Sequence, residues 1–186
     1  MSVGKRYILD ANVFIEAHHR YYGFDICPGF WLALLRQHQA NRIFSIDKVK
    51  QELVKVRGKD EDQDENEEDK LSKWVKEKAP KTLFKGTADK GVVDAFRNMV
   101  NWVQNEQQFT AEAKAAFSRS ADGWLVAYAT ANGLVVVTHE VYAPDSKTEV
   151  KLPNVCLEFE VDYCDTFDML RDLKEQFVLK KRQRTN

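Results

Sequence analysis

The segment YILDANVF, residues 7–14, opens with a short apolar run and places an aspartate, Asp10, directly after it, with Asn12 two residues further on. An apolar run of this length that stops at a turn residue is typical of a buried strand. In an open α/β sheet, ligands bind at the carboxyl ends of the strands. We therefore predict a strand over Arg6–Leu9 and treat Asp10 as a candidate site residue.

Short apolar runs and helical patterns alternate along the rest of the chain. Further strands are predicted at Arg42–Phe44 and Leu134–Thr138, and an edge strand at Val161–Tyr163. Apolar residues at helical spacing predict helices or helical turns at Val13–His18, Gly29–Gln39, Asp47–Val56, Glu67–Lys78, Ala88–Gln104, Ala111–Phe117, Ala121–Ala131 and Asp165–Phe177. This alternation predicts an α/β fold of three layers, with a small parallel sheet flanked by many helices.

Length and composition suit one soluble globular domain. The chain has 186 residues, of which 44% are hydrophobic and 31% charged, and such values are ordinary for this class. We expect a single domain over residues 1–179 and a flexible basic tail at 180–186. No apolar stretch approaches the roughly 20 residues that span a bilayer, and the start of the chain leaves no room for a signal peptide. The three cysteines form no C-x-x-C pair, which favours a reducing, cytoplasmic location.

The net charge of −1 conceals an acidic segment. Residues 59–70 hold eight acidic and two basic residues, a net charge of −6, so the other 174 residues carry +5. We interpret about 57–70 as an acidic insert and 57–66 as a solvated loop, and we expect the acidic segment 59–70 to be mobile and dispensable for folding. The mildly basic remainder is compatible with a polyanionic partner and does not demonstrate one.

Three further carboxylates stand at the ends or borders of predicted elements. Glu52 borders the apolar face of its helix, Asp122 opens the helix at 121–131, and Glu140 follows the strand at 134–138. Each acid alone also fits an ordinary role: a cap or turn for Asp10, a helix start for Asp122, and an exposed side chain for Glu52 and Glu140. If all four converge, a hard divalent cation must offset their repulsion. Two such ions would activate a water for phosphodiester cleavage.

Four segments carry a family resemblance. In order, "YILDANVFI", "SIDKVKQEL", "RSADGWLVAYA" and "VVVTHE" resemble the motifs of the PIN-domain nucleases, over about residues 5–142. The stretch "KLPNVCLEFEVDYCDTFDMLRDL" looks like a PIN-like branch known mainly as a domain of unknown function in bacteria and archaea. The resemblance implies a parallel sheet flanked by helices, Mg²⁺ or Mn²⁺, and ribonuclease activity. Many such proteins are toxins held by an antitoxin, and homodimers are common among them.

Carried over residue by residue, the resemblance implies one metal-binding and catalytic cluster: Asp10, Glu52, Asp122 and Glu140. Asn12 and Thr138 would support this cluster through hydrogen bonds to the ligands. Two features depart from the family pattern. The last acid is usually Asp and here is Glu140, with Asp145 nearby as a possible substitute, and the acidic insert is not part of the family core.

Two other site chemistries receive little support. The segment "ILDANVF" also resembles the first motif of haloacid-dehalogenase-type phosphatases, but that family requires an Asp at the position of Asn12 and a later pair of acids. The histidines show no H-E-x-x-H spacing, which disfavours a zinc site. His139, next to Glu140, is expected to face solvent, and the alternative is that it faces the site. We therefore predict a metal-dependent endoribonuclease acting on RNA, the toxin of a toxin–antitoxin pair. The alternative is a non-catalytic PIN-like module that binds a protein or RNA partner.

Overall fold

A five-stranded parallel sheet forms the centre of the computed structural model, which describes residues 4–55 and 70–178. The strand order is β3-β2-β1-β4-β5, and every neighbouring pair is parallel. The strands are β1 (Tyr7–Leu9), β2 (Ile43–Ile46), β3 (Phe84–Lys85), β4 (Val135–Val137) and β5 (Tyr163–Cys164). The small parallel sheet expected from the sequence is thereby confirmed.

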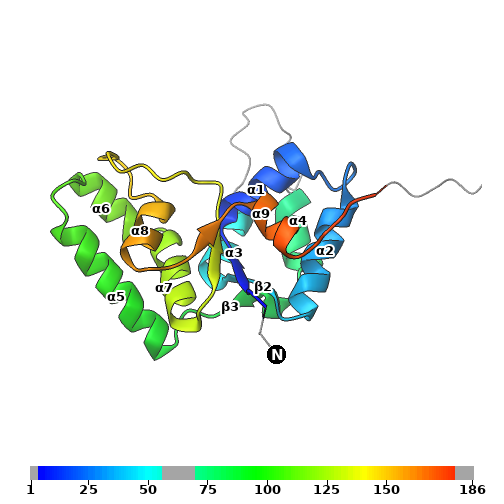
Figure 1. The fold of residues 1–186 in the computed structure, drawn as a ribbon, viewed down its shortest axis with the longest axis horizontal. Helices are drawn as coiled ribbons and strands as arrows, with labels where there is room; N and C mark the ends of the chain where they lie inside the picture. Colours follow the sequence, from blue (N-terminus) through cyan, green and yellow to red (C-terminus); the bar gives the residue numbers. More distant parts are fainter. Residues whose placement is uncertain (1–3, 56–69, 179–186) are drawn as a thin grey trace, which may run out of the picture.

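Helices cover both faces of this sheet and make three layers (Figure 1). Helices α1, α2, α4 and α9 lie on one side, and α5, α6, α7 and α8 lie on the other. The bounds are α1 (Ala11–Glu16), α2 (Pro28–Gln39), α3 (Asp47–Lys55), α4 (Lys70–Glu77), α5 (Lys90–Asn105), α6 (Ala111–Phe117), α7 (Asp122–Asn132), α8 (Leu152–Glu158) and α9 (Thr166–Asp172). A π-helical stretch, Ala17–Tyr21, continues α1, and a 3₁₀ turn, Lys81–Leu83, precedes β3. No described helix is long and apolar enough to cross a membrane.

The strand order reverses between the neighbouring strands β1 and β4. The chain builds β1, β2 and β3 in one direction and then returns to place β4 on the other side of β1. The connections that follow β1 and β4 therefore leave toward opposite faces of the sheet (Figure 1). At such a switch point the carboxyl ends of the two strands border an open space that binds ligands. Asp10 and Thr138 are the residues that follow these two strands.

Several boundaries differ from the sequence prediction, and each has a local cause. Strand β2 extends to Ile46, past the polar residue Ser45. The Ser45 hydroxyl donates a hydrogen bond to the carbonyl oxygen of Leu9 at 2.7 Å, so it is satisfied inside the sheet. Helix α9 ends at Asp172, since Lys174 adopts a left-handed conformation with φ 57°. Residues 81–85, for which no element was predicted, form a 3₁₀ turn and the edge strand β3.

The helix at residues 90–105 begins two positions later than expected. The Asp89 carboxylate accepts a hydrogen bond from the backbone N–H of Gly91 and thereby caps α5. The predictions for the loop at 57–66 and the tail at 180–186 lie outside the described residues. Among the described residues, a single hydrophobic core joins both faces of the sheet.

Candidate functional site

Asp10 links the two strands at the switch point. Its side chain is only 5% exposed and caps α1, with Oδ1 accepting from the backbone N–H of Ala11 at 2.6 Å. Its other oxygen, Oδ2, accepts from the hydroxyl of Thr138 at 3.0 Å. Burial raises the pKa of Asp10 well above its usual range, and the charge of Asp122 raises it further, while the two hydrogen bonds act in the opposite direction.

Thr138 and Asn12 hold the strand ends together. The Thr138 oxygen accepts from the Asn12 side-chain amide at 2.9 Å and from the backbone N–H of Glu140 at 3.2 Å. The Asn12 carbonyl oxygen in turn accepts from the backbone N–H of His139 at 3.1 Å. These bonds fix the orientation of Asp10 and the path of the chain after β4.

Asp122 begins α7 and lies beside Asp10. Burial, followed by the charges of Glu140 and Glu52, raises the pKa of Asp122 to about 7, and a hydrogen bond with Ser120 lowers it in part. The next residue, Gly123, sets how closely α7 packs. A Cβ atom there would lie 2.9 Å from ring carbons of both Phe96 and Phe117, so a larger residue would push the start of α7 away.

The two glutamates approach this pair from other elements. Glu52 comes from α3, and its Oε1 accepts from the backbone N–H of Ala121 at 3.1 Å. Glu140 follows β4, and its Oε2 accepts from the backbone N–H of Leu152 at 2.8 Å. The charge of Glu140 raises the pKa of both aspartates, and that of Glu52 raises the pKa of Asp122. The four sequence-predicted acids are therefore close enough to affect one another.

Three of these acids bind the amino-terminal ends of helices. Asp10 contacts α1, Glu52 contacts the residue before α7, and Glu140 contacts α8. The free N–H groups at a helix start carry partial positive charge and favour nearby carboxylates. This arrangement offsets part of the repulsion between the acids through the backbone alone.

Two other predicted residues are placed differently. Asp145 is exposed in the loop that follows Glu140. His139 is half-buried, and its Nε2 lies 2.9 Å from the hydroxyl of Thr166. His139 lines a groove beside Glu140. It packs against the rings of Tyr21 and Phe167, so it faces the site, as the alternative expected.

This groove of about 750 Å³ lies next to the site, and Glu140 is the member of the four acids that lines it. Asn12 and Glu140 line its inner end, and Tyr21 and Tyr142, each 47% exposed, line its walls together with Arg20 and Lys151. The ammonium of Lys151 is paired with Glu149, and its charge lowers the pKa of Asp122. Sequence reasoning missed these residues. Tyr142 and Lys151 lie in the polar loop next to Glu140, whereas the π-helical stretch that positions Tyr21 has no evident sequence signal.

The donor atoms suit a hard divalent cation, since all four acids offer carboxylate oxygens. Among residues 4–55 and 70–178, however, no three His, Cys, Asp or Glu side chains are positioned to hold a metal ion. Glu52 and Glu140 point one oxygen each at a backbone N–H. To bind an ion, each of these two carboxylates would have to use its other oxygen or give up its hydrogen bond to the backbone N–H.

The chain belongs to the family described as a domain of unknown function, DUF4411, which matches residues 7–177. No curated protein and no solved structure matches the chain. The matched region begins at β1 and extends past α9, so it contains the whole sheet and all four acids.

Proposed function

We propose that this protein is a metal-dependent endoribonuclease with a PIN-like site, in which Asp10, Glu52, Asp122 and Glu140 bind Mg²⁺ or Mn²⁺. The observation that carries the proposal is the pair of adjacent acids, Asp10 and Asp122, at the switch point of the sheet. Burial raises the pKa of both, and neighbouring carboxylates raise it further, that of Asp122 for Asp10 and those of Glu140 and Glu52 for Asp122. Strongly shifted carboxyls grouped in this way are typical of functional sites.

The chain's own residues would prepare the site for this chemistry. Thr138 and Asn12 hold Asp10 at the end of β1, and Gly123 lets α7 approach closely enough to place Asp122 beside it. A bound divalent ion would neutralise the acids and activate a water for attack on phosphorus. Lys151 lines the groove together with Glu140, and its ammonium would contact a substrate phosphate there.

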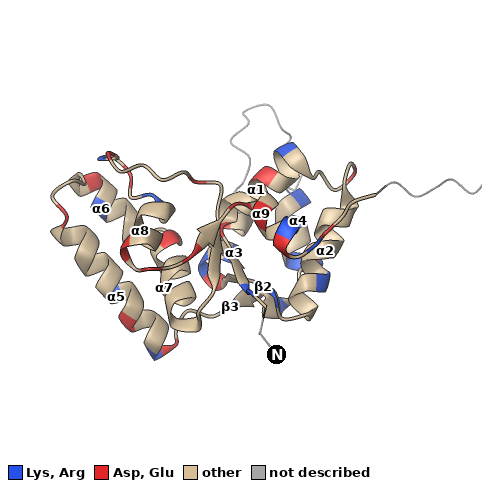
Figure 2. Ribbon diagram, in the orientation of Figure 1, with Lys and Arg blue, Asp and Glu red and all other residues tan. Residues whose placement is uncertain are grey.

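The groove supports a single-stranded nucleic acid as the substrate. Tyr21 and Tyr142 offer two half-exposed aromatic rings near the acids. Bases stack on such rings without regard to sequence, at roughly 1–3 kcal/mol per base. Arg20 lies along the same groove and is 69% exposed. Basic residues also lie along α4 (Figure 2), which adds positive charge for a polyanion.

The motif resemblance further supports a biological role as the toxin of a toxin–antitoxin pair in the cytoplasm, with an antitoxin protein as partner and a homodimer as a possible assembly. A protein encoded next to this chain should then co-purify with it and suppress cleavage at an equimolar ratio. Full ribonuclease activity in the presence of that protein would contradict the toxin role.

One observation favours the alternative, a non-catalytic module that binds a protein or RNA partner. Asp10, Glu52 and Glu140 each satisfy a helix N-terminus. These acids therefore contribute to the fold without any metal, as ordinary caps do.

Cleavage of a fluorescent single-stranded RNA separates the two functions. The parent protein should cleave with Mn²⁺ and stop when chelator is added. Asp122→Asn should lose at least a hundredfold in rate, whereas the matched change at an exposed acid, Asp145→Asn, should keep the parent rate. Binding without cleavage by the parent, or equal rates for parent and Asp122→Asn, would favour the non-catalytic module.

A further inference from the structure

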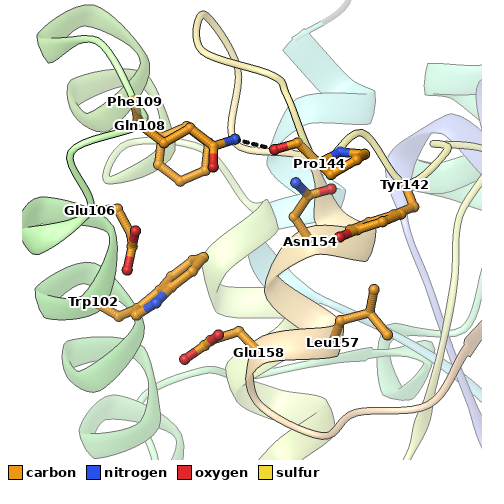
Figure 3. Close-up of a pocket in the computed structure, with 9 residues that line it drawn as sticks. All are labelled: Trp102, Glu106, Gln108, Phe109, Tyr142, Pro144, Asn154, Leu157 and Glu158. Carbon is orange, nitrogen blue, oxygen red and sulfur yellow. Dashed lines mark hydrogen bonds between the residues drawn. The ribbon is translucent and has the colours of Figure 1, made fainter.

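A second hollow lies beside the groove and shares Tyr142 with it. It has a volume of about 340 Å³ and is bounded by the end of α5, by α8 and by the loop between β4 and α8 (Figure 3). Trp102 and Glu106 project into it from the α5 side, while Tyr142 and Leu157 face them across the hollow (Figure 3). None of the acids at the switch point lines this hollow.

Hydrogen bonds hold the roof of the hollow to both walls. The Gln108 side-chain amide donates to the carbonyl oxygens of Pro144 and Ser146, at 2.6 and 2.7 Å. On the other wall, the Asn154 amide accepts from the backbone N–H of Ala143 at 3.1 Å and donates to its carbonyl oxygen at 2.8 Å. Because the loop is fastened at both sides, the hollow exists before any ligand binds.

The floor is equally well supported. The indole ring of Trp102 packs edge-to-face against Phe109 and Phe159, with centroid distances of 6.2 and 5.9 Å. Phe109 is only 7% exposed. These contacts fix the plane of the indole, so one of its faces can be presented to a ligand at little entropic cost.

The charged residues that line the hollow are all acidic. Glu106 and Glu158 line it, and no Lys or Arg does. Among the described residues, neither carboxylate makes a side-chain hydrogen bond or an ion pair, although Glu106 is half-buried. The two carboxylates therefore give the hollow a negative charge that no Lys or Arg in its lining balances.

We propose that this hollow binds an organic cation, an alkylammonium or guanidinium group, held over the Trp102 and Tyr142 rings and between the carboxylates of Glu106 and Glu158. The face of a tryptophan ring attracts such cations, and aromatic walls with nearby carboxylates are the usual way in which proteins recognise them. Neither anions nor purely apolar ligands fit, since the two carboxylates would repel the former and lose water to the latter. The site shares Tyr142 with the groove but contains none of the four acids, and the proposal does not rest on nuclease activity.

Titration with agmatine, which carries both kinds of cationic group, tests the proposal by tryptophan fluorescence. The fluorescence of the parent should change with agmatine concentration and then saturate. This change should be absent in Trp102→Phe, because the other tryptophans lie elsewhere in the fold. The double variant Glu106→Gln/Glu158→Gln should bind roughly tenfold more weakly or worse, since charge-assisted contacts are lost. Glu112→Gln, at an exposed acid of α6, should bind as the parent does.

The source of the cation is distinguished by a second titration. A capped Gly-Arg-Gly peptide is compared with the same peptide carrying uncharged citrulline. Tighter binding of the arginine peptide than of agmatine assigns the site to a side chain of a protein, and the reverse assigns it to a free amine. Equal binding of the citrulline peptide, an unchanged affinity in the double glutamine variant, or no saturable change with either cation would overturn the proposal. The melting temperature, raised by agmatine in the parent and not in the double variant, gives a second measurement.

Discussion

Replacing Asp122 by Asn should remove a pH-dependent loss of stability from the metal-free protein. Burial and the charges of Glu140 and Glu52 raise the pKa of Asp122 from 3.8 to about 7. Between these two pH values the folded protein holds a proton on this carboxyl, whereas the unfolded chain does not. The native state therefore binds more protons there, and the free energy of unfolding falls as the pH rises. The contribution of this carboxyl to the free energy of unfolding is fully present below pH ~4 and is lost above pH ~7.

The magnitude follows from the same values. Each pH unit in this range lowers the free energy of unfolding by about 1.4 kcal/mol, so the full loss is on the order of 4 kcal/mol, and roughly 3 kcal/mol falls between pH 5 and pH 8. Because the charge of Asp122 also raises the pKa of Asp10, the Asp122→Asn variant should relieve both groups.

Urea unfolding in the presence of chelator, followed by tryptophan fluorescence at pH 5 and pH 8, measures this effect. The parent should lose roughly 3 kcal/mol more than Asp122→Asn between the two pH values. Asp145→Asn changes an exposed acid and should show the same pH dependence as the parent. It therefore serves as the control for the loss of an ordinary surface carboxylate. An Asp122→Asn variant with the same pH dependence as the parent would refute the reasoning, because Asp122 would then titrate alike in both states.

Three further predictions concern the same site. Asp10→Asn replaces a carboxyl whose ionised form is disfavoured by burial and by the charge of Asp122, so in chelator it should melt at or above the parent temperature. Mn²⁺ should raise the melting temperature of the parent much more than that of the variant. Gly123→Ala should lower the free energy of unfolding by about 1–3 kcal/mol in urea titrations, since its Cβ meets two rings, whereas Gly86→Ala, in open space, should change it little. Glu140→Gln should lose RNA cleavage with Mn²⁺ present, whereas loss in Asp145→Asn with cleavage kept in Glu140→Gln would identify Asp145 as the fourth ligand.

The fold was accessible from the sequence because its signals are local. The run at Tyr7–Leu9 and the valines of β4 are buried on both faces of the sheet, so they read as continuous apolar segments. Asn132-Gly133 marks the end of α7, and Gly133 indeed adopts φ 61° there. Strand β3 could not be predicted because its two residues, Phe84 and Lys85, are too few to show a periodic pattern. They form a strand because they pair with β2, which is distant in the sequence.

The site was accessible only in part. Asp10 and Asp122 lie at element ends that the sequence marks, so their positions follow from the predicted strands and helices. The hydrogen bonds of Glu52 to Ala121 and of Glu140 to Leu152 depend on how distant elements pack, and no spacing in the sequence encodes them. The same holds for Tyr21, which reaches the groove because the chain forms a π-helical stretch after α1.

A crystal of the protein soaked in Mn²⁺ and measured at the manganese absorption edge tests the central claim most directly. The account predicts an anomalous peak at the carboxyl ends of β1 and β4, with carboxylate oxygens of Asp10 and Asp122 at about 2.0–2.2 Å and the peak absent from an Asp122→Asn crystal. A map without a peak at this place, or with one that persists unchanged in the variant, would contradict a metal-dependent site at these acids.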